Sequence, residues 1–286
     1  MKILVSGASG HFGRTAIKAL LNLGIPNEDI RAGAHNPKKA RDLSAQGIEV
    51  VRFDYDDFES LQNALRGVTH FLMVSVSQNT TPLDQHDLAI DAAQRAEDLE
   101  ILAFTSVYHA STSEIPLAPI FRAAEKRIIE RQIPHIFLRN NAYAEMYMGY
   151  IFQGIQNGVI VSSAGDAKIS AACREDLAQA AAHAIVNPIY YGKTLELIGD
   201  TPICFGDLAR IASQYRKEPV SIENISLEQS RQILQQSGLK GRDLEVMSQL
   251  ERVEAENKLF GTDHTLHSVL GKSTKTIEEL AADYLE

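Results

Sequence analysis

A glycine-rich turn near the N-terminus constrains the fold of this chain more than any other feature. Gly7, Gly10 and Gly13 form a GxxGxxG pattern between a short apolar run at residues 3–5 and a helical pattern at residues 15–23. Glycine permits a tight strand-to-helix turn, and at the third position it lets the helix lie close to the sheet. The helix N-terminus then presents free amides and its positive dipole end. The pattern predicts a diphosphate-binding turn, and a turn without a ligand is the alternative.

The first half of the chain alternates short apolar runs with helical periodicity. The expected strands are residues 3–5, 30–34, 48–53, 70–76, 101–105 and 135–138. The expected helices are residues 15–23, a segment after Pro37, a segment around Leu61 and Leu65, residues 88–99, and residues 117–128. This alternation is typical of a parallel sheet covered by helices on both faces. We therefore predict an α/β fold with a doubly wound parallel sheet of the Rossmann type.

Beyond Arg139 the pattern loosens, although no Pro-, Ser- or Gly-rich linker separates the two halves. Helices are expected at residues 177–185, 227–236, 244–253 and 277–285. We expect a nucleotide-binding domain at residues 1–140. Residues 141–286 are expected to form a smaller C-terminal substrate lobe that is partly interleaved with the sheet.

Composition excludes several classes of protein. The 286 residues include 28 Lys and Arg against 37 Asp and Glu, a net charge of −9, so no nucleic-acid partner is expected. Apolar runs are too short for a signal peptide or a membrane span. Two distant cysteines and nine histidines without ligand spacing predict neither a disulfide framework nor a metal site. We expect a cytoplasmic protein without a membrane partner.

The end of the second strand predicts which dinucleotide is bound. An acid at this position binds the ribose diol, whereas a basic residue binds a 2′-phosphate. His35 lies 35 − 13 = 22 residues past Gly13, and Lys38 and Lys39 follow without an acid. This favours NADPH, with NADH still possible, unless the lysines are merely solvated. Asp54 follows the third strand, where it meets an adenine or simply ends the strand.

Several short motifs together resemble the NmrA-like atypical short-chain dehydrogenases, and most closely their bacterial NAD(P)H:quinone oxidoreductase branch. The motifs are residues 5–13, 35–40, 104–106, 138–140 with Tyr143 and Glu145, 164–166, 195–197 and 270–276. The resemblance runs nearly end to end. It implies NADPH binding on the glycine turn and two-electron transfer to a quinone-like acceptor in a cleft between the lobes.

The resemblance also implies positions for the site residues. Expected cofactor contacts are Gly7, Ser9, Gly10, His11, Phe12, Gly13, His35, Lys39, Ser75, Ser77, Thr105, Ser106, Lys126 and Arg139. His35 stands where family members usually have Arg. The catalytic candidates are Asn140 and Tyr143, beside the nicotinamide, and Lys126, near its ribose.

The Tyr-x-x-x-Lys dyad of ordinary short-chain dehydrogenases is absent, because Tyr108 is followed four places on by Thr112. Quinone reduction relaxes the need for a dedicated acid, since a hydroquinone anion is a weak base that water can protonate. An aromatic stretch at residues 143–152 suits an aromatic acceptor or core packing equally well. The sequence thus favours an NADPH-dependent oxidoreductase acting on a quinone or related small molecule, with a homodimer allowed.

Two alternatives stay open at this point. One is a regulator that binds NADP(H) without chemistry, which the fold alone does not exclude. The other is an isomerase or reductase of a phenylpropanoid-like or nucleotide-sugar substrate, which should carry a proton-transfer group that the sequence does not reveal.

Overall fold

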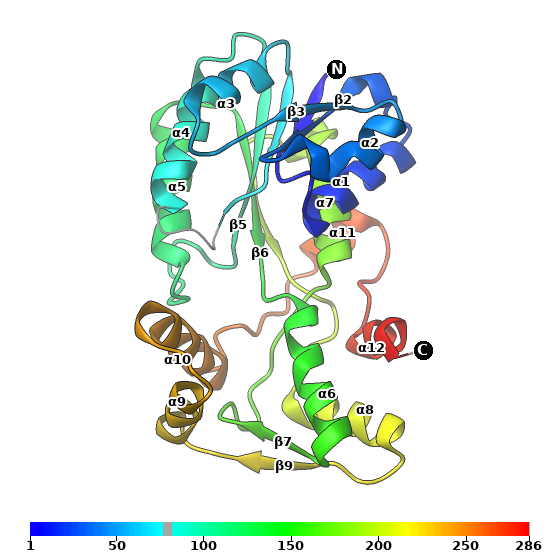
Figure 1. Ribbon diagram of the computed structural model, residues 1–286, viewed down its shortest axis with the longest axis vertical. Helices are drawn as coiled ribbons and strands as arrows, with labels where there is room; N and C mark the ends of the chain where they lie inside the picture. The colour runs from blue at the N-terminus through cyan, green and yellow to red at the C-terminus, as the bar shows by residue number, and fades with distance from the viewer. Residues whose placement is uncertain (77–81, 286) are drawn as a thin grey trace.

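The computed structural model describes residues 1–76 and 82–285 of the chain. Its main sheet has seven parallel strands in the order β3-β2-β1-β4-β5-β6-β8, and the order reverses between β1 and β4 (Figure 1). The strands are β1 (Ile3–Val5), β2 (Ile30–Ala34), β3 (Glu49–Arg52), β4 (His70–Met73), β5 (Ile101–Val107), β6 (His135–Asn140) and β8 (Thr194–Leu197). The predicted doubly wound α/β fold is confirmed.

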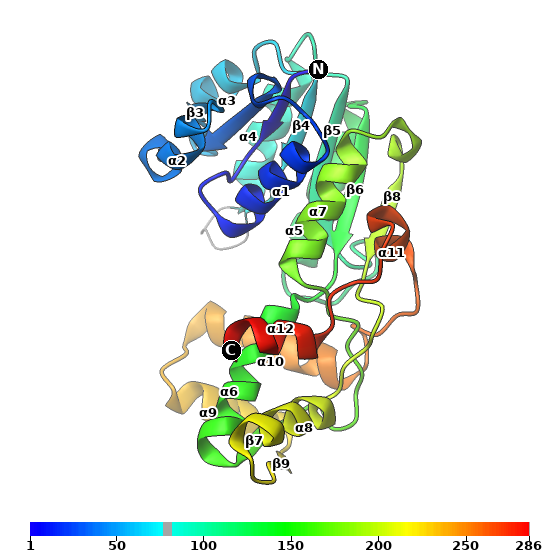
Figure 2. The ribbon, with the colours of Figure 1, turned by 90° about the vertical axis from the view of Figure 1, so that its right-hand side faces the viewer.

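Helices cover both faces of this sheet, as parallel strands require (Figure 2). One face carries α1 (His11–Asn22), α2 (Arg41–Ala45), α7 (Arg174–Ile185) and α11 (Thr265–Leu270). The opposite face carries α3 (Phe58–Leu65), α4 (Pro82–Gln94) and α5 (Ala118–Glu130). All of β1 is buried, which explains why the sequence shows a continuous apolar run there instead of alternation.

The second half of the chain completes the main sheet with a seventh strand, where the sequence had indicated only six. β8 pairs with β6 in parallel, and Leu195 lies opposite Leu138. α7 packs against α1 and buries a run of small side chains. These are Ala178, Ala180, Ala181, Ala182 and Ala184. Short side chains allow the two helices to approach closely, so residues after 140 belong to the sheet layers as well as to a second lobe.

The second lobe lies beyond the carboxyl ends of the strands (Figures 1 and 2). Its parts are a two-stranded parallel sheet and five helices: β7 (Val159–Ser162), β9 (Ser221–Asn224), α6 (Met148–Asn157), α8 (Phe205–Arg216), α9 (Leu227–Gln236), α10 (Gly241–Ala255) and α12 (Ile277–Leu285). Short 3₁₀ helices are η1 (Asn27–Asp29), η2 (Pro37–Ala40), η3 (Ala144–Tyr147) and η4 (Pro188–Tyr190). Within the described residues, no helix is both long and apolar enough to cross a membrane.

The fourth helix begins and ends earlier than its apolar spacing predicts. The expected helix spans residues 88–99, whereas α4 spans Pro82–Gln94. Pro82 suits a first helical turn because its missing N–H would have no partner there. At the other end Leu99 still packs against the core, but from a turn instead of a helix.

A carboxyl group is buried in the core of the second lobe. Glu254 of α10 is only 5% exposed and accepts a hydrogen bond of 2.8 Å from the Tyr147 hydroxyl. Burial raises the pKa of Glu254 to about 7, and the Tyr147 bond offsets only part of this effect. The folded protein therefore binds a proton here more tightly than the unfolded chain does.

We predict that Glu254→Gln changes how stability depends on pH. The proton on Glu254 favours the fold below about pH 4.5, and this contribution of about 3 kcal/mol is lost as the pH rises through about 7. Urea unfolding should therefore show that the free energy of unfolding of the variant rises relative to that of the wild type between pH 5 and pH 8. Glu245→Gln replaces an exposed carboxyl group on α10 and is the control. Its free energy of unfolding should follow that of the wild type over the same pH range. Parallel stability curves for Glu254→Gln and wild type would contradict the buried-proton interpretation.

Candidate functional site

The glycine turn at the end of β1 leaves the N-terminus of α1 open to a ligand. Gly7 has a positive φ of 64°, and its carbonyl oxygen accepts a hydrogen bond of 2.9 Å from the Gly10 N–H. A Cβ at Gly13 would lie 2.5 Å from that same oxygen, so only glycine fits. Gly10 is the N-cap; it has no side chain to cap the first-turn amides, and no acid lies in that turn. The turn therefore offers uncapped donors to an anion.

The other turn residues named from the sequence surround this opening. Ser9 and Phe12 are partly exposed and His11 is exposed. Phe12 packs on the same core face as Tyr143, although the two residues are far apart in the sequence. The turn and the end of β6 thus share one side of the sheet.

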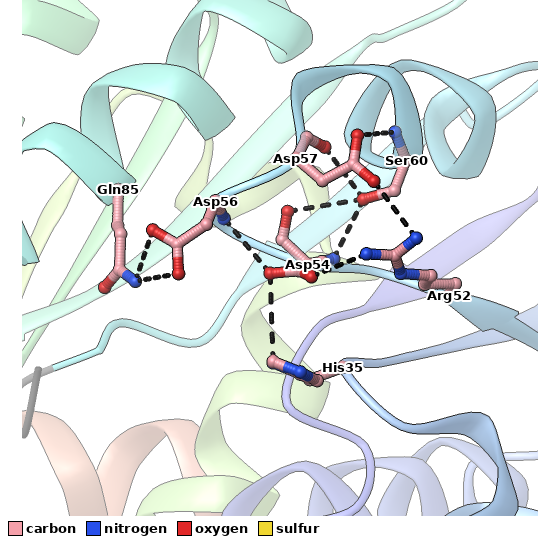
Figure 3. Close-up of polar contacts among 7 residues, drawn as sticks. All are labelled: His35, Arg52, Asp54, Asp56, Asp57, Ser60 and Gln85. Atoms are coloured by element: carbon pink, nitrogen blue, oxygen red, sulfur yellow. Dashed lines mark hydrogen bonds and ion pairs between the residues drawn. The ribbon is translucent and has the colours of Figure 1, made fainter.

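A cluster of charged side chains joins the ends of β2 and β3 (Figure 3). His35 is 79% exposed in its side chain, and its Nδ1 lies 3.8 Å from Oδ1 of buried Asp54. Arg52 lies 2.9 Å from the other oxygen of Asp54, and Asp56 N–H donates to Oδ1. Burial opposes ionisation, but these partners outweigh it and hold the pKa of Asp54 below its usual value. An acid therefore lies beside His35, one that the second strand alone did not reveal.

Two lysines follow His35 on the 3₁₀ helix η2. Lys38 and Lys39 are exposed, and neither forms an ion pair with another described residue. Arg14 of α1 fixes this segment, because it donates to the Lys39 carbonyl at 2.6 Å and pairs with Asp42. The lysine side chains remain available to a phosphate.

The ends of β4 and β5 meet through two hydroxyl side chains. Ser75 N–H donates to Thr105 Oγ1 at 2.8 Å, and the two hydroxyl oxygens lie 3.0 Å apart. Their contact with a cofactor stays a prediction. Ser77, also expected at this position, lies outside the described residues.

Arg139 and Ser106 do not face the cofactor side. Arg139 binds Glu125 of α5 through two nitrogens, at 2.9 and 2.6 Å, and Glu196 of β8 at 2.9 Å. Ser106 donates to the same Glu125 at 2.6 Å. These hydrogen bonds direct both side chains to the α5 side of the sheet, and their expected contact with the cofactor stays a prediction. The apolar pattern of a doubly buried strand does not reveal which face a residue occupies.

Lys126 is also separate from Asn140 and Tyr143. Its side chain is 75% exposed on α5, and Nζ lies 3.5 Å from Glu130 Oε1. α5 covers the face opposite to Asn140, so Lys126 lies apart from the Asn140–Tyr143 pair, and its expected role in the site stays a prediction. The neighbouring residue Glu125, not Lys126, points toward the sheet.

Asn140 and Tyr143 form the polar end of the candidate site. Asn140 is 7% exposed, and its Oδ1 is buried without a hydrogen-bond partner. Its side chain also bonds to Tyr143. Burial raises the pKa of Tyr143, while Arg174 and the Asn140 bond partly oppose this, so the phenol stays protonated at neutral pH. An unpartnered acceptor in a buried position points to a missing donor, such as a ligand amide or hydroxyl.

Sequence reasoning missed Arg174, the first residue of α7. Its guanidinium carbon lies 4.9 Å from the centre of the Tyr143 ring, in a cation–π arrangement. The start of the alanine-rich helix was the only local signal for this residue. The aromatic stretch at residues 143–152 is divided between core and surface. Tyr147, Met148 and Ile151 belong to the core of the second lobe, and Met146 is 42% exposed.

No group of three His, Cys, Asp or Glu side chains within residues 1–76 and 82–285 is arranged to hold a metal ion. The recognisable chemistry of the site lies instead in its backbone amides, its basic cluster and the Asn140–Tyr143 pair.

A doubly wound sheet with an uncapped glycine turn where the strand order reverses defines a dinucleotide-binding α/β protein. The NmrA-like family profile matches residues 1–281, and the chain belongs to this family. The resemblance expected from the motifs is confirmed.

Similar proteins include reductases that match nearly the whole chain. Quinone oxidoreductase 2 of Escherichia coli (strain K12) is 33% identical over 277 residues, which are 97% of this chain and 96% of that protein. The NAD(P)H azoreductase of Xenophilus azovorans is 24% identical and covers 98% of this chain and 96% of its own. A solved NADPH-dependent quinone oxidoreductase from Escherichia coli, complexed with NADPH, superposes with a TM-score of 0.94 at 32% identity, covering 99% of this chain and 100% of that one. Citrobacter sp. triphenylmethane reductase complexed with NADP(H) gives 0.92 at 30% identity, covering both chains fully.

We predict different effects for valine at two glycines of the turn. A Cβ at Gly10 meets only the Gly7 oxygen at 3.3 Å, so Gly10→Val should fold but lose more than about 90% of its NADPH affinity. Gly13→Val drives its side chain into backbone and should lower the free energy of unfolding by about 1–3 kcal/mol or more. Calorimetric titration and urea unfolding separate the two effects. Wild-type NADPH affinity in Gly10→Val would show that the turn does not bind the diphosphate.

Proposed function

We propose that this protein is an NADPH-dependent oxidoreductase that reduces a quinone or a related conjugated carbonyl. One observation carries the proposal: the buried, unpartnered Oδ1 of Asn140 lies at the same edge and on the same side of the sheet as the uncapped turn of α1. In parallel sheets, ligands bind outside the carboxyl ends of the strands where the order reverses. A dinucleotide reaching from the turn toward β6 would meet Asn140.

The residues present fit NADPH. Its diphosphate would bind the first-turn amides of α1, its 2′-phosphate the basic cluster of His35 and Lys39, and its nicotinamide end the region of Asn140. Bound NADPH supplies the hydride. The two similar solved reductases described above are complexes with NADPH and NADP(H), which supports this assignment.

Asp54 limits how strongly the basic cluster attracts a phosphate. Its carboxylate lies beside His35, where it would repel a 2′-phosphate. Arg52 lies against the same carboxylate and offsets this charge. The preference for NADPH over NADH would therefore depend mainly on the unpaired lysine Lys39.

The acceptor would lie beside Tyr143 and Asn140. Tyr143 stays protonated and can donate a hydrogen bond to an acceptor oxygen, while the Asn140 side chain positions the phenol. Water can protonate a hydroquinone anion, so no dedicated acid is required. The separate position of Lys126 is compatible with this chemistry.

A regulator that binds NADP(H) without chemistry is the second candidate. The exposed Lys126 favours it, because this lysine pairs with Glu130 and lies away from the Tyr143 phenol that it would activate. The two candidates differ in one measurable property, turnover. Either would work in the cytoplasm, where the two free cysteines, Cys173 and Cys204, would stay reduced.

We predict that the protein binds NADPH more tightly than NADH. Lys39→Glu should weaken NADPH binding by about 1–3 kcal/mol and leave NADH binding nearly unchanged, because only NADPH carries the 2′-phosphate. Lys18→Glu, on the exposed face of α1 two turns beyond the glycine turn, is the matched control with the same change of charge. Calorimetric titration of all three proteins measures this. Equal affinities of the wild type for the two nucleotides would contradict the phosphate site.

We also predict that the purified protein oxidises NADPH in the presence of small quinones, measured by the loss of NADPH absorbance. Asn140→Ala should lower kcat/KM about tenfold or more while changing NADPH affinity less, because it removes the support of Tyr143. Reactions without protein and without quinone are the controls. NADPH binding without any quinone-dependent turnover would favour the regulator.

A further inference from the structure

The acceptor end of the site carries a positive charge that the proposed chemistry does not use. We propose that Arg174 recognises an anionic substituent, a carboxylate or a sulfonate, on the aromatic acceptor. The substrates of this class would be negatively charged quinones and related aromatic compounds. The inference rests on the proposed function, because it takes the acceptor to bind beside Asn140 and Tyr143.

Backbone pairing fixes Arg174 relative to Tyr143. Ala144 N–H donates to the Ala172 carbonyl, and Ala172 N–H donates to the Ala142 carbonyl, each at 3.0 Å. Tyr143 and Ala172 therefore form a parallel bridge, and α7 begins two residues later. The half-buried guanidinium of Arg174 consequently lies over the Tyr143 ring. The backbone bridge and the contact with the Tyr143 ring hold the Arg174 side chain in place, so it does not extend into solvent.

The charge of Arg174 is not neutralised by a carboxylate. Among the described residues, no ion pair within 4.0 Å involves its guanidinium. Glu145 is close, but it accepts from the backbone N–H of Arg174, at 2.9 and 3.3 Å. Glu175, the next residue of α7, pairs with Lys275 at 3.4 Å. A guanidinium stacked by its face keeps its in-plane N–H donors available for two-point binding of a carboxylate or sulfonate.

The Asn140–Tyr143 pair beside Arg174 is open to a bound molecule, and an anionic molecule would need a local cation there. The Asn140 Oδ1, nine-tenths buried and unpartnered, belongs to the same Asn140–Tyr143 pair and would receive a donor from a bound molecule. The whole chain carries a net charge of −9, which repels an anionic acceptor in solution. An anionic acceptor would therefore need a local cation, and Arg174 supplies one at the ring that would contact it.

Binding of redox-inert probes tests the inference without turnover. Naphthalene-2-sulfonate and naphthalene-2-sulfonamide have nearly the same shape, but only the first is an anion. Calorimetry on the protein saturated with NADP⁺ should show Arg174→Gln binding the sulfonate about tenfold more weakly than wild type, and the sulfonamide with nearly unchanged affinity. Arg174→Lys keeps the charge but loses the planar guanidinium, so its affinity for the sulfonate should lie between those of the wild type and Arg174→Gln. Arg210→Gln, which removes an exposed arginine of α8 paired with Glu278, is the control for net charge.

Turnover supplies a second comparison. The ratio of kcat/KM for 1,4-naphthoquinone-2-sulfonate to that for 1,4-naphthoquinone should fall about tenfold in Arg174→Gln, while NADPH affinity stays at the wild-type value. Equal losses for the charged and neutral compounds, or a parallel loss of NADPH affinity, would overturn the inference. If Arg174→Gln does not fold, the same ratios in Arg174→Lys decide the question. If neither quinone is reduced by wild-type protein, the proposed function fails, and the sulfonate binding still tests Arg174 separately.

Discussion

The close packing of α7 against α1 is the interaction on which the sheet and the candidate site both depend. The buried alanines of α7 allow it to lie close to α1, and the absence of a side chain at Gly13 allows α1 to lie close to the glycine turn. The same packing places Arg174 at the carboxyl edge of the sheet, on the side where α1 begins. A bulky residue in this contact would disturb the fold, the glycine turn and the end of the site together.

The opposite side of the sheet carries a charged network in addition to its apolar core. Arg139, Glu125 and Glu196 connect β6, α5 and β8, and Glu196 also accepts the backbone N–H of His109. Desolvation makes such a partly buried network a weak source of net stability, although breaking it would leave carboxylates unpaired. The network fixes which way Arg139 points, and the next residue, Asn140, consequently points toward the cofactor side.

Much of the fold could be predicted from the sequence because strands, helices and the glycine turn have local signals. Six of the seven strands of the main sheet follow from apolar runs, and α9 and α12 begin and end at the expected residues. β8 was missed because a four-residue edge strand resembles many other short apolar segments. The start of α4 was missed because Pro82 has no apolar periodicity before it.

The site was harder to predict, since it depends on which face a residue occupies and on partners far away in the chain. Arg139 and Lys126 are polar residues in suitable segments. Tertiary pairing directs Arg139 to Glu125, and Lys126 lies on the exposed face of α5 beside Glu130. The acid beside His35 comes from the neighbouring strand, which a reading of the second strand alone omits. Arg174 is separated from Tyr143 by a whole excursion through the second lobe, so no local spacing connects them.

The chain passes repeatedly between the two lobes, because it leaves the sheet after β6, returns for α7 and β8, leaves again, returns for α11 and ends in α12. The second lobe is consequently not one continuous segment of the chain, and recombination at a single junction could not exchange it. A graft from a relative would need several matched crossings, and each would have to preserve a strand or helix of the nucleotide-binding layer. Changes in acceptor preference would therefore be expected to arise by point substitution within the lobe and not by replacement of the lobe.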